Sequence, residues 1–235
     1  SAASSDYPLR DVYKRQTFEA MGCFGMTAIT AITAQNTRGV RSIQALPPQL
    51  LAEQIDAVVE DLGVDAVKIG MLHDPAVVRV VAQAVDRHRL ACVVLDPVMV
   101  ATSGDRLIAD DTQAVLVSEL FPRATLITPN LDEAGWLIGQ PIESAQALEA
   151  AARRLQAMGA RAVLLKGGHL AGPVLTDLLL DGDTVTRWAG PRIESDNTHG
   201  TGCTLSSAIA CGLARGRSTP DAVAMARDYV RGALA

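Results

Sequence analysis

Residues 162–168 read Ala162-Val163-Leu164-Leu165-Lys166-Gly167-Gly168, a short apolar run that ends in a lysine and two glycines. Three other runs have the same form and cover residues 66–70, 92–96 and 125–130. Short runs rich in Val, Ile and Leu are typical of buried parallel strands. Helical patterns separate or follow these runs, at residues 48–62, 74–88, 110–120 and 144–158. The alternation predicts an α/β fold with helices on both faces of a mostly parallel sheet.

The four predicted strands end in polar or small residues, namely Gly70, Asp96, Asn130 and Lys166. The carboxyl ends of parallel strands lie at one edge of a sheet, which is where open α/β sheets bind ligands. Four runs that agree are stronger evidence for a site than any one of these residues alone.

Two further pairs of segments predict antiparallel additions to the sheet. Residues 174–180 and 184–188 flank Asp181-Gly182-Asp183, which is a turn signal. Residues 27–33 and 40–46 flank the polar stretch 34–39 and predict a small β flap.

Composition limits the classes of function. The chain has 235 residues, of which 49% are hydrophobic, so it can bury one sizeable core. The net charge of −5 argues against a nucleic-acid groove, and no apolar run approaches the roughly 20 residues that span a bilayer. The four cysteines form no C-x-x-C pair, so we expect neither disulfides nor zinc, as in the reducing cytoplasm.

The segment Asn197-Thr198-His199-Gly200-Thr201-Gly202-Cys203 runs directly into a predicted helix. Backbone N–H groups at a helix start have no partner within the helix and favour an anion. Glycines allow the backbone to come close to a bulky phosphate. The segment therefore predicts a phosphate-binding loop, with the Cys203 thiol beside it as a base or a nucleophile.

Four other motifs each have two interpretations. Asn130 and Glu133 are spaced either to hold Mg²⁺ through oxygen ligands or to form a helix capping box. Lys166 can meet a phosphate or extend from the sheet edge into solvent. Asp96 can act on metal-bound water or a reacting hydroxyl, or cap a local turn. The Gln35 amide can pair with a heterocycle edge or belong to an ordinary turn.

Taken together, these motifs resemble the hydroxymethylpyrimidine and hydroxymethylpyrimidine-phosphate kinases of thiamine biosynthesis, within the ribokinase-like superfamily. The resemblance covers residues 17–235 and rests on six ordered motifs, found at residues 34–40, 68–72, 94–99, 128–134, 166–169 and 197–205. It implies a three-layer αβα sandwich with a small β flap. It also implies a cytoplasmic enzyme that transfers phosphoryl groups from ATP to a hydroxymethyl group or to its phosphate.

The resemblance also implies roles for single residues. Cys203 would take or orient the proton of the substrate hydroxyl, and Gly200, Thr201 and Gly202 would form the anion hole. Lys166 would neutralise phosphate charge and, with Asn130, Thr198, Gly200 and Gly202, would bind the nucleotide. Glu133, Asn130 and Asp96 would act on Mg²⁺ through water. Gln35 would contact the aminopyrimidine, and Met71 and Val98 would line its pocket.

The first sixteen residues depart from this family, which normally opens with a β-strand, a glycine-rich loop and a helix. Residues 1–16 are polar, contain Pro8 and lack an amphipathic period. We therefore expect an atypical segment at residues 1–16, followed by a kinase domain at 17–235 that is incomplete at both ends. Without a central strand, we expect the remaining site to bind the nucleotide but pyrimidine phosphorylation to be weak or lost.

Three functions fit these observations. The first is a kinase of the thiamine pathway that acts on the hydroxymethylpyrimidine, as a homodimer by family resemblance. The second is a pyridoxal kinase, from the nearest related family. The third is a non-catalytic protein that binds a nucleotide or a pyrimidine.

Overall fold

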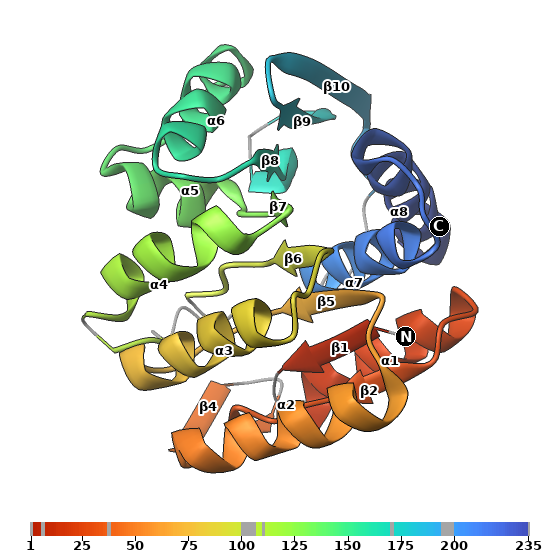
Figure 1. Cartoon of the computed structure of the whole chain (residues 1–235). Coiled ribbons are helices and arrows are strands. Elements are labelled where there is room, and N and C mark those ends of the chain that lie inside the picture. The colour runs from red at the N-terminus through yellow and green to blue at the C-terminus, as the bar shows by residue number, and fades with distance from the viewer. Residues whose placement is uncertain are drawn as a thin grey trace.

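The computed structural model describes residues 2–5, 8–36, 39–99, 107–109, 111–169, 172–193 and 200–234. Its elements surround one large sheet, shown in Figure 1. The strands are β1 (Ala2–Ser5), β2 (Gly25–Thr27), β3 (Ala31–Asn36), β4 (Gly39–Ala45), β5 (Ala66–Ile69), β6 (Val93–Leu95), β7 (Leu126–Ile127), β8 (Ala162–Leu165), β9 (Val174–Asp181) and β10 (Thr184–Pro191).

Helices connect most of these strands. They are α1 (Pro8–Ala20), α2 (Pro48–Leu62), α3 (Pro75–Arg87), α4 (Thr112–Leu120), α5 (Leu131–Ile138), α6 (Leu148–Ala157), α7 (Thr201–Ala214) and α8 (Thr219–Leu234). Short 3-10 turns lie at η1 (Phe121–Arg123), η2 (Ala145–Ala147) and η3 (Gly167–His169). Among the residues that the structure describes, no helix is both long enough and apolar enough to cross a membrane.

The large sheet has the strand order β10-β9-β8-β7-β6-β5-β1-β2. Neighbouring strands are parallel to one another in the part of the sheet made of β2, β1, β5, β6, β7 and β8. The strands β9 and β10 are antiparallel additions. The predicted parallel sheet and the predicted hairpin at residues 174–188 are both confirmed. Gly182 turns that hairpin with a φ of 58°, a left-handed conformation that glycine adopts without strain.

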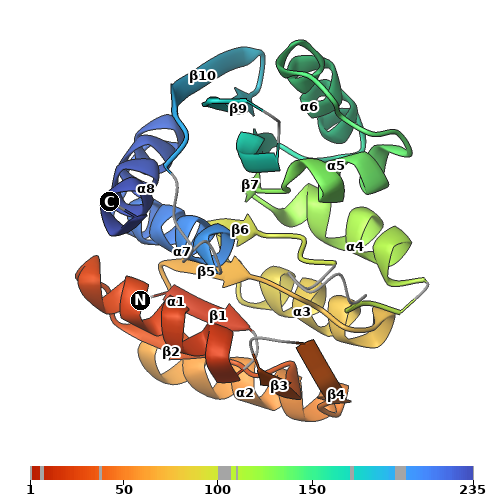
Figure 2. The ribbon, with the colours of Figure 1, turned by 180° about the vertical axis from the view of Figure 1, so that it is seen from behind.

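Alternation along the strands produces the three layers. Val93 and Leu95 face the cluster that includes side chains of α2 to α6, whereas Val94 between them faces the cluster formed with α7 and α8. Because side chains of a strand point alternately to opposite faces, a strand buried on both faces is apolar throughout. Figures 1 and 2 show α3 and α4 on one face of the sheet and α7 and α8 on the other, which confirms the αβα sandwich.

The β flap is a separate two-stranded sheet of β3 and β4. We predicted one strand over residues 27–33, and the structure divides this stretch. Thr27 ends β2 in the large sheet, and Ala31 begins β3 in the flap. The chain leaves the large sheet between these two residues, where Ile29 hydrogen-bonds through its backbone to the Gln54 side chain of α2.

The expectation that the first sixteen residues lack a strand is wrong. β1 lies between β2 and β5 and pairs with both in parallel, and α1 follows it. Its backbone is paired on both sides, although its sequence lacks the continuous apolar run of the other central strands. The segment expected to replace the family's glycine-rich loop includes residues 6–7, which lie outside the described residues.

Candidate active site

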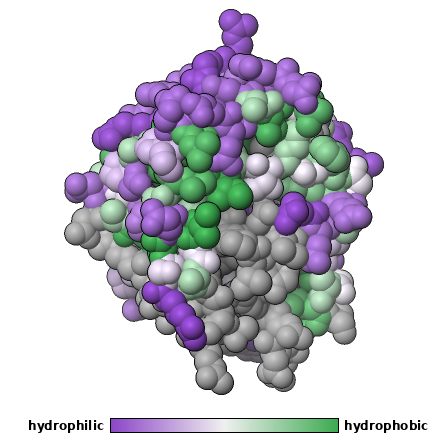
Figure 3. All heavy atoms as spheres, turned by 90° about the horizontal axis from the view of Figure 1, so that it is seen from below, coloured by the Kyte–Doolittle hydropathy of each residue, from purple (hydrophilic) through white to green (hydrophobic). Residues whose placement is uncertain are grey.

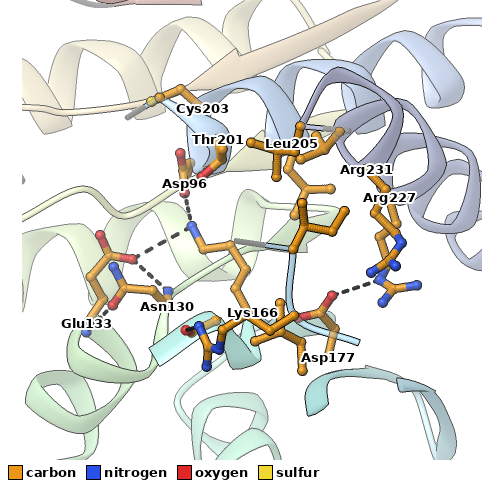
Figure 4. Close-up of a pocket in the computed structure, with 18 of the residues that line it drawn as sticks. Asp96, Asn130, Glu133, Lys166, Asp177, Thr201, Cys203, Leu205, Arg227 and Arg231 are labelled. Carbon is orange, nitrogen blue, oxygen red and sulfur yellow. Dashed lines mark hydrogen bonds and ion pairs between the residues drawn. The ribbon is translucent and has the colours of Figure 1, made fainter. Parts of the chain in front are cut away.

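A cavity of about 470 Å³ lies at the carboxyl edge of the sheet, between β6 to β9 and the helices α7 and α8. Figure 4 shows the side chains that point into it. Its lining includes the polar residues that we predicted at the strand ends and at the start of the last motif, namely Asp96, Asn130, Glu133, Lys166, Gly200, Thr201, Gly202 and Cys203. The structure thus brings together residues that are more than a hundred positions apart in the chain.

Asp96 follows β6 and is 1% exposed. Its carboxylate accepts hydrogen bonds from Lys166 Nζ at 2.8 Å and from Thr128 Oγ1 at 3.2 Å. Lys68 Nζ lies 3.5 Å from its other oxygen. Burial opposes ionisation, but the charges of Lys166 and Lys68 outweigh it and hold the pKa of Asp96 well below its usual range. Asp96 is therefore a buried carboxylate that keeps its charge.

Lys166 follows β8 and reaches across the edge of the sheet toward Asp96 (Figure 4). Its backbone forms an isolated parallel bridge with Asn130, so two of the predicted site residues are joined through the main chain. Its Nζ also lies 4.0 Å from Glu133 Oε2. Burial lowers the pKa of Lys166, but Asp96 and Glu133 raise it further, so the net shift is upward and the side chain stays protonated.

Asn130 and Glu133 form the capping box that was one of their two interpretations. Asn130 Oδ1 accepts from the Glu133 N–H at 2.8 Å, and Glu133 Oε2 accepts from the Asn130 N–H at 2.8 Å. Both residues nevertheless line the cavity, and Glu133 is 7% exposed. The capping role is confirmed, and it places a carboxylate and an amide at the cavity wall.

Helix α7 begins at the cavity. Gly200 is its N-cap and has a φ of 84°, which few residues other than glycine adopt. A Cβ at Gly202 would lie 3.2 Å from Lys166 Nζ, so the lack of a side chain lets the ammonium group reach the first turn of α7. Cys203 lies in that turn and is 5% exposed. The predicted residue Thr198 lies outside the described residues.

The residues predicted to line the pyrimidine pocket also lie together. Met71 and Val98 form one apolar cluster with Ala31 of the flap and with Leu107. Val98 lines the cavity directly. Gln35 ends up near the tip of the same flap, on β3, but its side chain is not among those described.

Other residues of the site were not predicted. Lys68 could have been noticed as a charge inside an apolar run. Ser206 on α7, whose hydroxyl lies 3.2 Å from Asp96 Oδ2, gives no such signal. Asp177 on β9 and Arg227 on α8 line the cavity from a hairpin and a surface helix, and their positions follow no motif.

A helix N-terminus, a half-buried lysine and a buried thiol at the carboxyl edge of an αβα sandwich are features of a small-molecule kinase of the ribokinase-like fold. Structural comparison agrees. The crystal structure of phosphomethylpyrimidine kinase from Clostridium difficile 630 is 32% identical, with a TM-score of 0.87 over 100% of this chain and 98% of that one. The ADP complex of Bacillus subtilis pyridoxal kinase is 30% identical, with a TM-score of 0.89 over 97% of this chain and 89% of that one.

Sequence comparison separates these two kinds of kinase. The hydroxymethylpyrimidine/phosphomethylpyrimidine kinase of Rhizobium meliloti is 48% identical over 93% of this chain and 82% of that protein. Its counterpart in Escherichia coli is 44% identical over 94% and 83%. The family profile for phosphomethylpyrimidine kinase matches residues 15–235. The chain belongs to the phosphomethylpyrimidine kinase family.

Proposed function

We propose that this chain transfers the terminal phosphoryl group of ATP to the hydroxymethyl group of 4-amino-5-hydroxymethyl-2-methylpyrimidine, and then phosphorylates the resulting monophosphate. The observation that carries this proposal is the convergence of Lys166, Cys203 and the start of α7 on one cavity. These are the three parts that phosphoryl transfer to a hydroxyl needs: a cation, an anion hole and a group that handles the proton.

The first turn of α7 would hold the transferring phosphoryl group. The N–H groups of Gly200, Thr201 and Gly202 lie at a helix start, where backbone donors and the helix dipole favour negative charge. Since charge on the phosphoryl oxygens must be stabilised in the transition state, donors fixed in this way lower the barrier without reorganising.

Lys166 would meet the phosphate chain as a point charge. Its ammonium group already lies beside the start of α7, and Asp96 holds it there at 2.8 Å. The Lys166 side chain is 14% exposed, so its charge is screened little by water. Asp96 thus orients the cation that the nucleotide would use.

Mg²⁺ fits the donors at the cavity wall. Glu133 and Asn130 supply hard oxygen ligands, and an ion that keeps several waters needs only one or two carboxylates from the protein. Asp96 is already bonded to Lys166 and Thr128, which favours contact with the ion through water. When bound, the ion would neutralise charge on the phosphates.

Cys203 in its thiolate form would accept the proton of the substrate hydroxyl while the new O–P bond forms, the bond from the γ-phosphorus to the bridging oxygen breaks and ADP leaves. Alternatively, Cys203 would hold that hydroxyl in line. Met71 and Val98 would pack against the pyrimidine ring, and Gln35 would pair with its amino group and ring nitrogen.

A cytoplasmic location goes with this proposal, because the four cysteines are free thiols.

An assay of the purified chain with ATP, Mg²⁺ and the hydroxymethylpyrimidine tests this function. We expect the monophosphate and then the diphosphate, resolved by ion-exchange chromatography. Pyridoxal, assayed in parallel, should be the poorer substrate by kcat/KM. A preference for pyridoxal would instead support a pyridoxal kinase, and ATP binding without product from either acceptor would support a non-catalytic binding protein.

We also propose that the chain is a homodimer. Large apolar side chains that are exposed concentrate in one part of the described sequence, at Phe24, Ile29, Ile32, Leu50 and Leu62. Exposed apolar surface often marks an interface. Figure 3 shows hydrophobic side chains among hydrophilic ones on one face of the molecule. Light scattering coupled to size exclusion would measure the mass, and a monomer at all concentrations would contradict this proposal.

A further inference from the structure

We infer that Arg227, on α8, is a positioning residue for Lys166 and acts on it through Asp177. The inference rests on the proposed function, in which Lys166 meets the phosphates of the nucleotide. Arg227 and Asp177 both line the cavity. Their ion pair also supports the backbone segment that carries Lys166.

Asp177 uses its two carboxylate oxygens on two different elements. Oδ1 accepts from the Gly167 N–H at 2.8 Å, directly after Lys166 in the chain. Oδ2 accepts from Arg227 Nε at 2.7 Å, across the cavity wall on α8 (Figure 4). One carboxylate therefore joins α8 to the backbone of the residue that follows Lys166.

The segment after Lys166 has little room to move. A Cβ at Gly167 would lie 1.8 Å from the carbonyl oxygen of Thr176, so the Gly167 backbone packs directly against β9. On the next residue, the Gly168 carbonyl accepts from Arg192 Nη1 at 3.0 Å. Since Lys166 is bonded to Gly167 and bridged to Asn130, a shift of Gly167 would move the base of the Lys166 side chain.

Arg227 is itself held in place. Its guanidinium lies 5.4 Å from the centre of the Trp188 ring, and Trp188 pairs with Asp177 across the β9–β10 ladder. The side chains of Arg227 and Asp177 are only 12% and 18% exposed. A charge-assisted bond that is shielded from water in this way is stronger than an exposed surface pair. The pair therefore has both the geometry and the strength to fix Gly167.

The chain offers a matched control on the same hairpin. Arg187 of β10 pairs with Glu149 of α6 at 2.6 Å, but these side chains are 50% and 35% exposed. Neither residue lines the cavity. Losing this pair removes an arginine and an ion pair without touching Gly167.

The test is a double-mutant cycle between Arg227→Met and Lys166→Met, read as the dissociation constant of ATP with Mg²⁺ and no acceptor. Calorimetric titrations to millimolar ATP keep weak binding measurable. We expect R227M alone to weaken ATP binding about 10-fold, the order expected for a lost charge-assisted bond. In the K166M chain it should change binding by less than about 2-fold, because a residue that acts through Lys166 has nothing left to position. R187M should match the unchanged chain.

R227K supplies a second measurement if R227M folds poorly, which thermal unfolding would reveal. It keeps a cation for Asp177, so ATP binding should stay within about 3-fold of the unchanged chain. An equal loss from R227M in both backgrounds would overturn the inference, because Arg227 would then contact the nucleotide itself. No loss from R227M would also overturn it. If the unchanged chain binds no ATP, the proposed function fails as well, which distinguishes the two failures.

Discussion

Lys166 Nζ and Asp96 Oδ1 lie 2.8 Å apart, although their residues follow β8 and β6 and are separated in the sheet by β7. The contact crosses the carboxyl edge of three adjacent strands. Because the two residues follow different strands, the Lys166–Asp96 contact can form only when the strands have assembled into the sheet.

The thiol of Cys203 should be needed for catalysis rather than for nucleotide binding. We expect Cys203→Ala to lower kcat by about 100-fold or more, the usual range for a group that handles a proton. The dissociation constant of ATP should stay close to that of the unchanged chain. Cys92→Ala is the control, since Cys92 is half-buried and lies outside the cavity. A C203A enzyme with normal kcat would remove Cys203 from the mechanism.

The negative charge of Glu133 should strengthen Mg²⁺ binding, although the same carboxylate accepts a hydrogen bond in the capping box. In Glu133→Gln the amide oxygen can still accept from the Asn130 N–H, so α5 should keep its cap. We expect the Mg²⁺ concentration for half-maximal activity to rise about 10-fold, because a neutral ligand holds a hard cation less well. Thermal unfolding checks that the fold is intact. An unchanged Mg²⁺ dependence would show that Glu133 is a helix cap and nothing more.

Acid should weaken the fold through Asp96. An unfolded aspartate has a pKa of about 3.9, and the folded pKa of Asp96 lies below this. As pH falls through this window, the unfolded chain binds a proton that the folded chain does not, so stability falls with pH. Asp96→Asn should be less stable at neutral pH, because Lys166 and Lys68 each lose one negatively charged neighbour, yet its stability should fall less steeply below pH ~4.

Urea unfolding at a series of pH values measures that slope. Asp61→Asn is a suitable control, because Asp61 is exposed on α2, far in sequence from the cavity residues. Its slope should match that of the unchanged chain. A D96N slope that also matched would mean that folding does not shift the pKa of Asp96.

Adjacent glycines give a sharp test of the packing after Lys166. Gly167→Ala should destabilise the protein by about 1–3 kcal/mol or more, because its Cβ would overlap the Thr176 carbonyl and force the backbone apart. Gly168→Ala should cost far less, since no atom lies within 4 Å of the added carbon. Thermal or urea unfolding compares the two. Equal stability of both variants would contradict the close contact between Gly167 and β9.

The sheet was predictable because its central strands are buried on both faces and are therefore apolar without interruption. Asp96, Asn130 and Lys166 stood out because each ends such a run. β1 was not predicted, since Ala2–Ser5 has no apolar pattern and its place in the sheet depends on pairing with β2 and β5. Local sequence carries no record of which distant strand a short segment will join.

The same reason explains the residues of the site that were missed. Asp177 lies on a strand with an apolar centre, and Arg227 lies on an amphipathic helix. Each fits its element as an ordinary polar residue. Only the packing of α8 beside the β9–β10 hairpin makes them partners. The segment at residues 197–203 was easier to find, because its glycines stand directly before a predicted helix.

The buried pairs of the cavity have a consequence for which molecules can enter. Its lining carries the anions Asp96, Glu133 and Asp177 and the cations Lys166, Arg192, Arg227 and Arg231, so the charges of these side chains nearly balance. Lys166 and Arg227 are already paired with Asp96 and Asp177, so an anion that entered would compete with these carboxylates. A nucleotide bound to Mg²⁺ brings a cation for the carboxylates as well as phosphates for the lysine and arginines. It can therefore replace the existing ion pairs without leaving one partner uncompensated. The paired charges would thereby favour a nucleotide that carries its metal ion over one that arrives without it.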